Sequence, residues 1–262
     1  MGESMRPILF HLSGHHIHSN HVTLLLAGLL ALFVISIEMS RMEEVPGKIW
    51  PLLILLIISG LIGARLLYCI DFRVQYMCSL RNIFKFWKGG TALYGGVIFA
   101  FITYCIYITW QRLNFWRIGD MLAPGATLFV FVARIGCILV GCCYGKPCSR
   151  DLPLAMTFNN YSAPAPKFIP LYPTQPLFAA TTLLVFVVLW LRRKRKRFEG
   201  EIALIGISLY TLFSFFIEFL RGDPRVLYQI AGIGFSQNQI IGTLIFLVAS
   251  GCWVAGYYEE EG

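Results

Sequence analysis

Hydrophobic residues are grouped along this chain into seven long segments, separated by short polar or charged stretches. A helix needs about 20 predominantly apolar residues to cross the hydrocarbon core of a bilayer. The pattern therefore predicts an all-α membrane protein, a polytopic bundle of about seven transmembrane helices with outward-facing loops and an interfacial segment. The segments cover residues 22–37, 49–70, 91–110, 119–142, 173–191, 202–221 and 235–257.

The composition argues against a water-soluble protein. Of the 262 residues, 57% are hydrophobic and 14% are charged, and the mean hydropathy is +0.67, whereas soluble domains contain about 25% charged residues. No segment has the form of a cleaved signal peptide, so we expect the first helix to be retained. We expect one transmembrane domain over residues 1–262, with an N-terminal arm at 1–21 and a long outer loop at 143–172.

A run of basic residues sets the expected orientation. The net charge is +8, and residues 192–197 are six successive arginines and lysines that follow the fifth apolar segment. Such a run can bind nucleic acid, but beside a span it is better explained by the positive-inside rule, and we expect no nucleic-acid partner. With this loop in the cytoplasm, alternating spans place the N-terminus outside and the C-terminus in the cytoplasm.

Two loops are then expected on the outer face. The 143–172 loop is rich in proline and about 30 residues long, which is unusual for a simple connector and favours a lid or a binding segment. The 71–90 loop carries Phe84, Phe86 and Trp87. These residues are typical of an amphipathic segment that lies in the membrane interface.

One arginine stands inside an apolar run. Arg134 lies in the string ARIGCILVGCCYG, which also holds Gly136, Gly141 and Gly145. A guanidinium at membrane depth costs several kcal/mol on insertion scales, so it is expected to serve a partner or a ligand. The glycines allow a backbone or a substrate to approach closely. We interpret the string as a site for an anionic ligand, with a lipid headgroup as the first candidate.

Other polar groups lie within or at the ends of the spans. Glu218 and Arg221 are three residues apart, so on a helix they share a face and can form an ion pair, with Tyr210 two turns earlier on roughly the same face. Arg65 either contacts a ligand or snorkels near a helix end. The remaining candidates, for which helix packing is the alternative role, are Gln175, Gln239, Gly95 and Gly96.

Four of the eight cysteines, Cys137, Cys142, Cys143 and Cys148, are clustered after Arg134. A disulfide to Cys148 or Cys78, simple packing, and a reactive thiol beside the arginine are all open. A soft-metal site is a further, less favoured alternative, because the spacing fits no zinc pattern and no histidine is nearby in the sequence, and we expect no metal and no cofactor. The five histidines, all between residues 11 and 21, form either a solvated arm or a metal-binding tract.

Five stretches form an ordered set of motifs: residues 60–65, 86–96, 134–145, 172–177 and 210–223. They resemble, in order, a Gly-Gly-Arg element, Trp-Asp-Gly-Gly and His-Gly-Gly elements, the motif Gly-Arg-Xaa-Gly-Asn…Asn-Gly-Glu…Gly, a His-Pro-Ser-Gln-Leu-Tyr element and a pattern ending Glu-Phe-Phe-Arg. This set is similar to that of the bacterial prolipoprotein diacylglyceryl transferase family, whose members have seven spans. The resemblance covers most of the chain.

Several positions depart from the family pattern. Tyr94 stands where the family has a histidine implicated in catalysis, and Ser214 stands where it has an arginine in the sixth span. Cys137 replaces the asparagine that follows Arg-Xaa-Gly. Cys142 falls in the region of the glutamate that precedes the last glycine of the motif.

The resemblance implies a transferase of the bacterial inner membrane. It would move diacylglyceryl from a phosphatidylglycerol-like phospholipid to an acceptor thiol, on a lipobox peptide or elsewhere. Two alternatives stay open: a thiol-dependent enzyme on the same scaffold, and a lipid or anion transporter. The expected catalytic residues are Arg134, Tyr94, Arg221, Glu218, Cys142 and Cys143, and the expected substrate-binding residues are Gly95, Gly96, Arg65, Cys137, Gly145, Gln175, Tyr210 and Gln239.

Overall fold

A computed structural model describes residues 8–12, 15–71, 93–152, 154–159, 164–223, 227–230 and 233–259. These residues form seven helices: α1 (Ser19–Arg41), α2 (Pro46–Asp71), α4 (Leu93–Gln111), α5 (Phe115–Val140), α6 (Thr174–Arg192), α7 (Glu201–Glu218) and α8 (Gln237–Glu259). Each predicted apolar segment corresponds to one helix. Within the described ranges, six helices are long and apolar enough to span a membrane, and Gly95–Gln111 of α4 is a shorter apolar helix. The predicted all-α, multi-pass membrane architecture is confirmed.

Three small two-stranded antiparallel sheets accompany the helices in the described part of the chain. Strand β1 (Ile8–Leu12) pairs with β2 (His15–His18), β3 (Met156–Thr157) pairs with β4 (Pro170–Leu171), and β5 (Leu227–Ile230) pairs with β6 (Ile233–Ser236). The predicted interfacial segment at 71–90, with Cys78, lies almost wholly outside the described residues. Its role stays a prediction.

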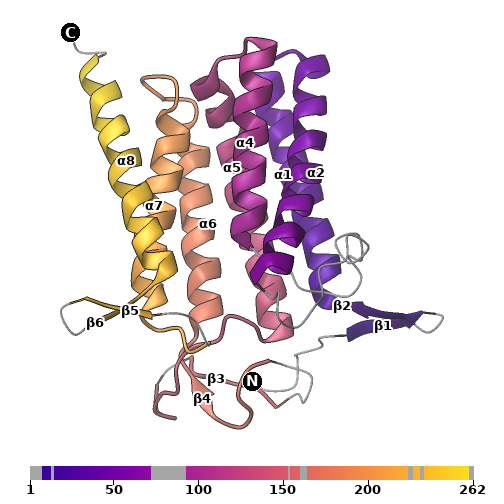
Figure 1. Cartoon of the computed structure of the whole chain (residues 1–262), viewed down its shortest axis with the longest axis vertical. Coiled ribbons are helices and arrows are strands. Elements are labelled where there is room, and N and C mark those ends of the chain that lie inside the picture. The colour runs from indigo at the N-terminus through magenta and orange to yellow at the C-terminus, as the bar shows by residue number, and fades with distance from the viewer. Residues whose placement is uncertain are drawn as a thin grey trace. The chain divides into compact units, whose positions relative to one another are not determined.

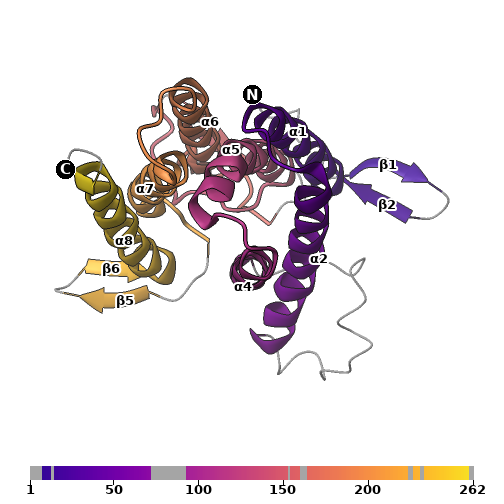
Figure 2. The same cartoon turned by 90° about the horizontal axis from the view of Figure 1, so that it is seen from above.

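The chain divides into two compact units, one of residues 1–38 and 119–262 and the other of residues 39–118. The expectation of a single domain over 1–262 stays a prediction. In the unit 39–118, α2 and α4 pack side by side (Figure 2). A Cβ atom on Gly63 would lie 2.4 Å from the carbonyl oxygen of Gly95, and one on Gly95 would lie 2.1 Å from the carbonyl oxygen of Gly63. The helix backbones therefore meet where only glycine leaves room, as expected for small residues in a membrane.

In the unit of residues 1–38 and 119–262, α7 packs between α6 and α8 (Figure 2). A buried cluster of Val185, Leu189 and Ile202 joins α6 to α7. The sheets β3–β4 and β5–β6 lie together at one end of α6, α7 and α8 (Figure 1). The basic run 192–197 follows the opposite end of α6, so the two ends of these helices differ in chemistry.

The basic run is held to the helices by ion pairs. Three of its six cations contact carboxylates that are almost completely buried. A buried carboxylate is stable only with such a partner, so the run has a structural role as well as a topological one. The pairs are Arg193 with Glu38, Arg192 Nη2 with Glu201 Oε1 at 2.8 Å, and Lys196 Nζ with Asp120 Oδ2 at 2.9 Å.

The described part of the 143–172 loop is folded on itself. Phe158, Ala165 and Leu171 form a small buried cluster, with Tyr144 and Met156 packed against it. Sheet β3–β4 and the backbone hydrogen bond from Cys148 N to the Pro170 oxygen, 2.9 Å long, join its two ends. The described part of the loop therefore has its own small core.

Candidate functional site

Arg134 lies near the C-terminal end of α5, and it contacts two other helices. Its Nη2 donates a hydrogen bond to the hydroxyl of Tyr210 on α7 at 3.5 Å, and its Cζ lies 4.3 Å from the ring centroid of Phe178 on α6. Among the described residues, no carboxylate pairs with it. The hydroxyl of Tyr210 and the ring of Phe178 hold the guanidinium in place without neutralising its charge. The positive charge is therefore available to an anionic ligand.

Three cysteines meet at the turn that follows α5. The Sγ atoms of Cys137, Cys142 and Cys143 all lie within 4.8 Å of one another; we call them the thiol cluster. Gly141 and Cys143 have φ angles of 78° and 57°. These left-handed residues bend the chain back, so that Cys142 and Cys143 come beside Cys137 on the last turns of the helix.

The first residues of α6 hold this turn in place. The hydroxyl of Thr174 donates to the carbonyl oxygen of Cys143 at 2.9 Å, and Nε2 of Gln175 donates to that of Cys142 at 2.8 Å. Gln175 is only 1% exposed, and its Oε1 has no hydrogen-bond partner among the described residues. Gln175 was a predicted site residue, whereas Thr174 was missed because threonine is common at helix starts.

The thiols of Cys142 and Cys143 differ in pKa. Hydrogen bonds from Cys137 and Cys142 lower the pKa of Cys143 far below its ordinary value, and although burial opposes this, the charges of Arg221 and Arg134 lower it further. Hydrogen bonds from Cys142 to Cys137 and Cys143, together with burial, raise the pKa of Cys142. The cluster therefore stabilises a thiolate at Cys143.

The disulfide that the sequence allowed between this cluster and Cys148 is not formed. Cys137, Cys142, Cys143 and Cys148 are all free thiols. The backbone of Cys148 is instead bonded to Pro170, within the folded 143–172 loop. The alternative disulfide to Cys78 involves a residue outside the described ranges.

Glu218 and Arg221 form the predicted ion pair, with Arg221 Nη1 3.1 Å from Glu218 Oε2. Arg221 also donates from Nε and Nη2 to the two carboxylate oxygens of Asp223, at 2.9 and 2.5 Å. Burial alone would lower the pKa of Arg221, but Asp223 and Glu218 raise it overall, so the guanidinium stays charged. Two carboxylates thus neutralise this cation, unlike that of Arg134.

Gln239 caps a helix. The backbone N–H of Ser236 donates to Oε1 of Gln239 at 2.9 Å, and the backbone N–H of Gln239 donates to Oγ of Ser236 at 3.3 Å. This reciprocal pair is a capping box at the start of α8. Nε2 of Gln239 donates to the carbonyl oxygen of Phe215, and Ser236 Oγ and Asn238 Nδ2 donate to Glu218. These bonds join α7 to α8, which is the packing role that the sequence left open.

Gly145 lies where two other chain segments cross. A Cβ atom there would be 2.3 Å from the carbonyl oxygen of Tyr172, and one on Gly222 would be 2.6 Å from the carbonyl oxygen of Gly145. Backbone hydrogen bonds join the segments, including Gly222 N to the Tyr144 oxygen at 2.9 Å and Tyr172 N to the Lys146 oxygen at 3.0 Å. Gly145 was predicted to bind substrate. The contacts that the structure describes for it are with the neighbouring chain segments, and a role in substrate binding stays a prediction.

Four predicted site residues belong to the unit 39–118. Arg65 is buried on α2, with its Cζ 5.5 Å from the ring centroid of Tyr68. Gly95 and Gly96 lie in the contact between α4 and α2. Tyr94 is within α4, but its side chain lies outside what the structure describes. Roles for these residues in binding or catalysis stay predictions.

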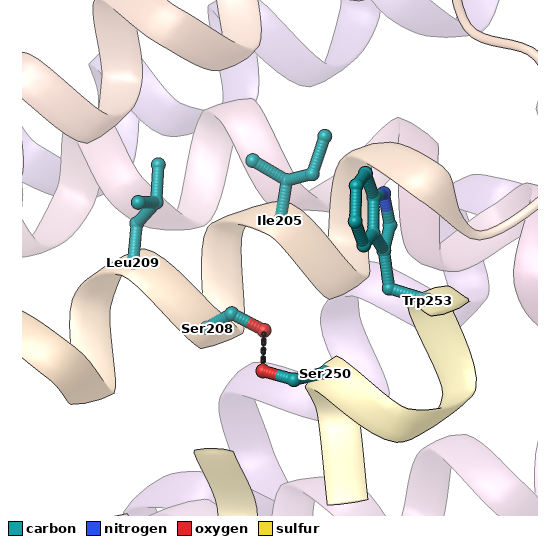
Figure 3. A pocket seen from close by; sticks show the side chains of 5 residues that line it. All are labelled: Ile205, Ser208, Leu209, Ser250 and Trp253. Atoms are coloured by element: carbon teal, nitrogen blue, oxygen red, sulfur yellow. Dashed lines mark hydrogen bonds between the residues drawn. The ribbon is translucent and has the colours of Figure 1, made fainter. Parts of the chain in front are cut away.

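A cavity of about 150 Å³ lies between α7 and α8 (Figure 3), and no predicted site residue lines it. Its walls are mostly apolar, and Ser250 Oγ donates to Ser208 Oγ at 3.4 Å across it. A cavity this small cannot enclose a diacyl lipid. The residues that line it are Ile205, Ser208, Leu209, Ser250 and Trp253.

Comparison with known proteins shows which family the chain resembles over most of its length. Residues 7–255 match the model of the prolipoprotein diacylglyceryl transferase family. The chain is similar to proteins named phosphatidylglycerol–prolipoprotein diacylglyceryl transferase. One from Clostridium tetani is 32% identical over 84% of this chain and 87% of the relative. One from Polaromonas naphthalenivorans is 26% identical over 95% of this chain and 94% of the relative.

Proposed function

Because the chain belongs to the prolipoprotein diacylglyceryl transferase family, we propose that it transfers diacylglyceryl from phosphatidylglycerol to the thiol of a lipobox cysteine. The names of its relatives, phosphatidylglycerol–prolipoprotein diacylglyceryl transferases, support both substrates. The chain itself is a multi-pass membrane protein. The observation that carries the proposal is the un-neutralised guanidinium of Arg134 between three apolar helices.

Arg134 is the group best suited to hold the phosphate. A half-buried cation at membrane depth without a carboxylate partner is costly, and a phosphodiester that enters the site removes that cost by forming charge-assisted hydrogen bonds. Tyr210 and Phe178 contact one edge and one face of the guanidinium, so its remaining N–H groups can reach a ligand. As the phosphate leaves, its charge grows, and a fixed cation stabilises that state more than the ground state.

Arg221 has a different role in this proposal. Its donors are occupied by Glu218 and Asp223, so it contributes little net charge to a bound phosphate. It joins the end of α7 to the segment that crosses Gly145, and its charge still lowers the pKa of Cys143. Arg221 and Glu218 therefore position the site rather than bind the reacting phosphate.

The reaction forms one bond and breaks another. The acceptor thiolate attacks the glyceryl carbon that carries the phosphate, a sulfur–carbon bond forms, and the carbon–oxygen bond breaks to release glycerol phosphate. The acceptor thiol must first lose its proton. A tyrosine stands at position 94 in place of the family's histidine, and phenols ordinarily titrate near pH 10, so they are weak bases at neutral pH.

The proposed orientation follows the positive-inside rule. With residues 192–197 in the cytoplasm, Arg134 and the thiol cluster lie at the outer end of α5 and α6. The N-terminus is then outside and the C-terminus in the cytoplasm. An acceptor peptide that has crossed the membrane would meet the site there.

Mass spectrometry of the product tests the function. Purified protein in phosphatidylglycerol vesicles is incubated with a lipobox peptide and, separately, with the same peptide carrying serine for cysteine. We expect a thioether-linked diacylglyceryl product from the cysteine peptide alone. Replacing Arg134 by Gln should lower the rate by about 100-fold or more, the cost of losing one transition-state donor. Arg150→Gln, an exposed position in the same outer loop, is the matched control. The absence of product from the unaltered protein, or full activity of Arg134→Gln, would contradict the proposal.

A further inference from the structure

The thiol cluster has the dimensions of a metal site. Zinc–sulfur bonds are about 2.3 Å long, so tetrahedral ligands lie about 3.8 Å apart. The three Sγ atoms already lie within 4.8 Å of one another as free thiols. Only a small adjustment of side chains would place all three on one ion.

The backbone is bent to produce this arrangement. Adjacent residues in an extended chain point to opposite sides, yet Cys142 and Cys143 both lie beside Cys137. The bend uses a left-handed conformation at Cys143, with φ of 57°, which is unfavourable for a residue other than glycine. Such strain persists where the surroundings impose it, and it is concentrated at ligand sites. Here the surroundings are the hydrogen bonds from Thr174 and Gln175 to the carbonyl oxygens of the turn.

Gln175 gives a second, independent indication of a ligand. Its side chain is 1% exposed, and its Nε2 is fixed on the Cys142 carbonyl. The oxygen of the same amide is buried, one side-chain amide away from the turn that carries Cys142, and no described residue donates to it. A buried acceptor without a donor is unfavourable, and a bound ligand with an N–H group would satisfy it.

The ligand set and the charges favour zinc. No imidazole or carboxylate of the described residues joins the three thiols. Three protein ligands leave the fourth position of a tetrahedral ion open, as in catalytic rather than structural zinc sites. Three thiolates and Zn²⁺ together carry one negative charge, which the guanidinium of Arg134 would compensate, since it already acts on the charge of Cys143. Zinc is also redox-inert, in keeping with a transfer that involves no electron exchange.

We propose that Cys137, Cys142 and Cys143 bind one Zn²⁺ ion and that its open position binds the acceptor cysteine as a thiolate. A thiol that coordinates zinc is deprotonated, and its proton passes to water. The zinc-bound sulfur then attacks the glyceryl carbon, the carbon–oxygen bond to phosphate breaks, and glycerol phosphate leaves with the bonding electron pair. The metal site stands on the geometry alone, whereas the role of the metal rests on the proposed function.

Metal content tests the site without any assay of activity. Protein purified in detergent is loaded with Zn²⁺, passed through a desalting column and measured by inductively coupled plasma mass spectrometry. We expect about one zinc per chain, and at least a tenfold loss of zinc in each of C137S, C142S and C143S. Cys148→Ser, in the same loop but outside the cluster, should keep its zinc. Gln175→Leu should weaken zinc binding by about tenfold, because groups that hold the ligands in place affect affinity.

Cobalt gives a readout that does not depend on the folding of any variant. With Co²⁺ in place of zinc, the unaltered protein should show the near-ultraviolet absorption of thiolate–cobalt bonds. Addition of the cysteine lipobox peptide should change the visible bands, and the serine peptide should not. The site would be overturned by the absence of thiolate–cobalt absorption or by a disulfide within the cluster. It would also be overturned by a zinc content below about a tenth of an ion per chain, or by equal zinc contents in all the variants.

The same samples separate this inference from the proposed function. If zinc binds but phosphatidylglycerol and the lipobox peptide give no product, the transferase proposal fails and the metal site stands. If protein stripped of metal by a chelator makes product as fast as the zinc-loaded protein, the transferase stands and the role of zinc is overturned. We expect activity to fall on chelation and to return on addition of zinc.

Discussion

Gly145 offers a sharp test of how the backbone beside the thiol cluster is built. Its backbone lies between the segment at Tyr172 and the segment at Gly222, and hydrogen bonds run to both. Its φ is not in the left-handed region, so the backbone itself would accept alanine. Space alone forbids a side chain, because the added Cβ would lie 2.3 Å from the Tyr172 carbonyl oxygen.

The cost of Gly145→Ala can be worked from that distance. Ordinary contact begins near 3.4 Å, so one segment must move by about 1 Å, which forces the packed segments apart. Such a movement would break about two of the backbone hydrogen bonds across the crossing, at 0.5–1.5 kcal/mol each, and would add overpacking of 1–3 kcal/mol. We expect a loss of about 2–6 kcal/mol in stability, or about 4–24 °C in Tm for a chain of this size.

Thermal unfolding in one detergent, followed by circular dichroism, measures this loss. Gly242→Ala on α8 and Gly47→Ala on α2 are matched controls, because a Cβ at either position meets nothing within 4 Å. Both controls should match the unaltered protein or exceed it slightly, since alanine favours helix. If Gly145→Ala unfolds at the same temperature as the controls, the crossing is not as close as described and the reasoning fails.

Three further predictions concern charges and thiols. Replacing Glu218 by Gln should lower stability by about 1–3 kcal/mol and the transfer rate severalfold, because its buried carboxylate accepts hydrogen bonds from Arg221, Ser236 and Asn238; an unchanged Tm would contradict this. Asp120→Asn should destabilise the start of α7 by about 1–3 kcal/mol, since the carboxylate of Asp120 accepts the N–H groups of Gly200 and Ala203 as well as Lys196; faster hydrogen exchange at residues 200–204 is the readout. In metal-free protein, the rate at which iodoacetamide alkylates Cys143 should change little from pH 6 to pH 9, because the lowered pKa leaves the thiolate present throughout this range. A rate that rises about tenfold per pH unit, as for an ordinary thiol, would contradict this expectation.

The sequence predicted the elements that depend on local pattern. Runs of apolar residues located the seven helices, because a bilayer requires every span to be long and apolar. The spacing of Glu218 and Arg221 predicted their ion pair, because helical geometry places residues three apart on one face. The capping box of Ser236 and Gln239 was also readable, as a serine followed by glutamine three residues later, but it was missed.

Contacts between distant segments could not be predicted in the same way. The contact of Arg134 with Tyr210 depends on how α5 and α7 pack, and nothing in either segment specifies it. The thiol cluster depends on left-handed backbone at Gly141 and Cys143, whereas the linear spacing of the cysteines argued against a metal site. The partner of Lys196 is Asp120 from another helix, so the basic run looked like a purely topological feature.

The resemblance to a family supplied what neither pattern nor spacing contained. It gave a substrate class for an arginine inside an apolar span, which the local sequence could assign only to some anion. It also marked Cys137 and Cys142 as departures, and the structure brings these two residues together with Cys143. The two cysteines that depart from the family pattern are therefore neighbours in space, and the single proposed metal site accounts for both.

The central claim is that Arg134 binds the phosphate of the lipid, and equilibrium binding of two lipids by native mass spectrometry tests it most directly. Phosphatidylglycerol and diacylglycerol with the same acyl chains differ only in the phosphate headgroup. The unaltered protein should bind phosphatidylglycerol more tightly than diacylglycerol. Arg134→Gln should weaken the binding of phosphatidylglycerol by about tenfold to 100-fold, which is what hydrogen bonds to a charged group contribute. Diacylglycerol should bind both proteins equally. An Arg134→Gln variant that binds phosphatidylglycerol as tightly as the unaltered protein would contradict the account.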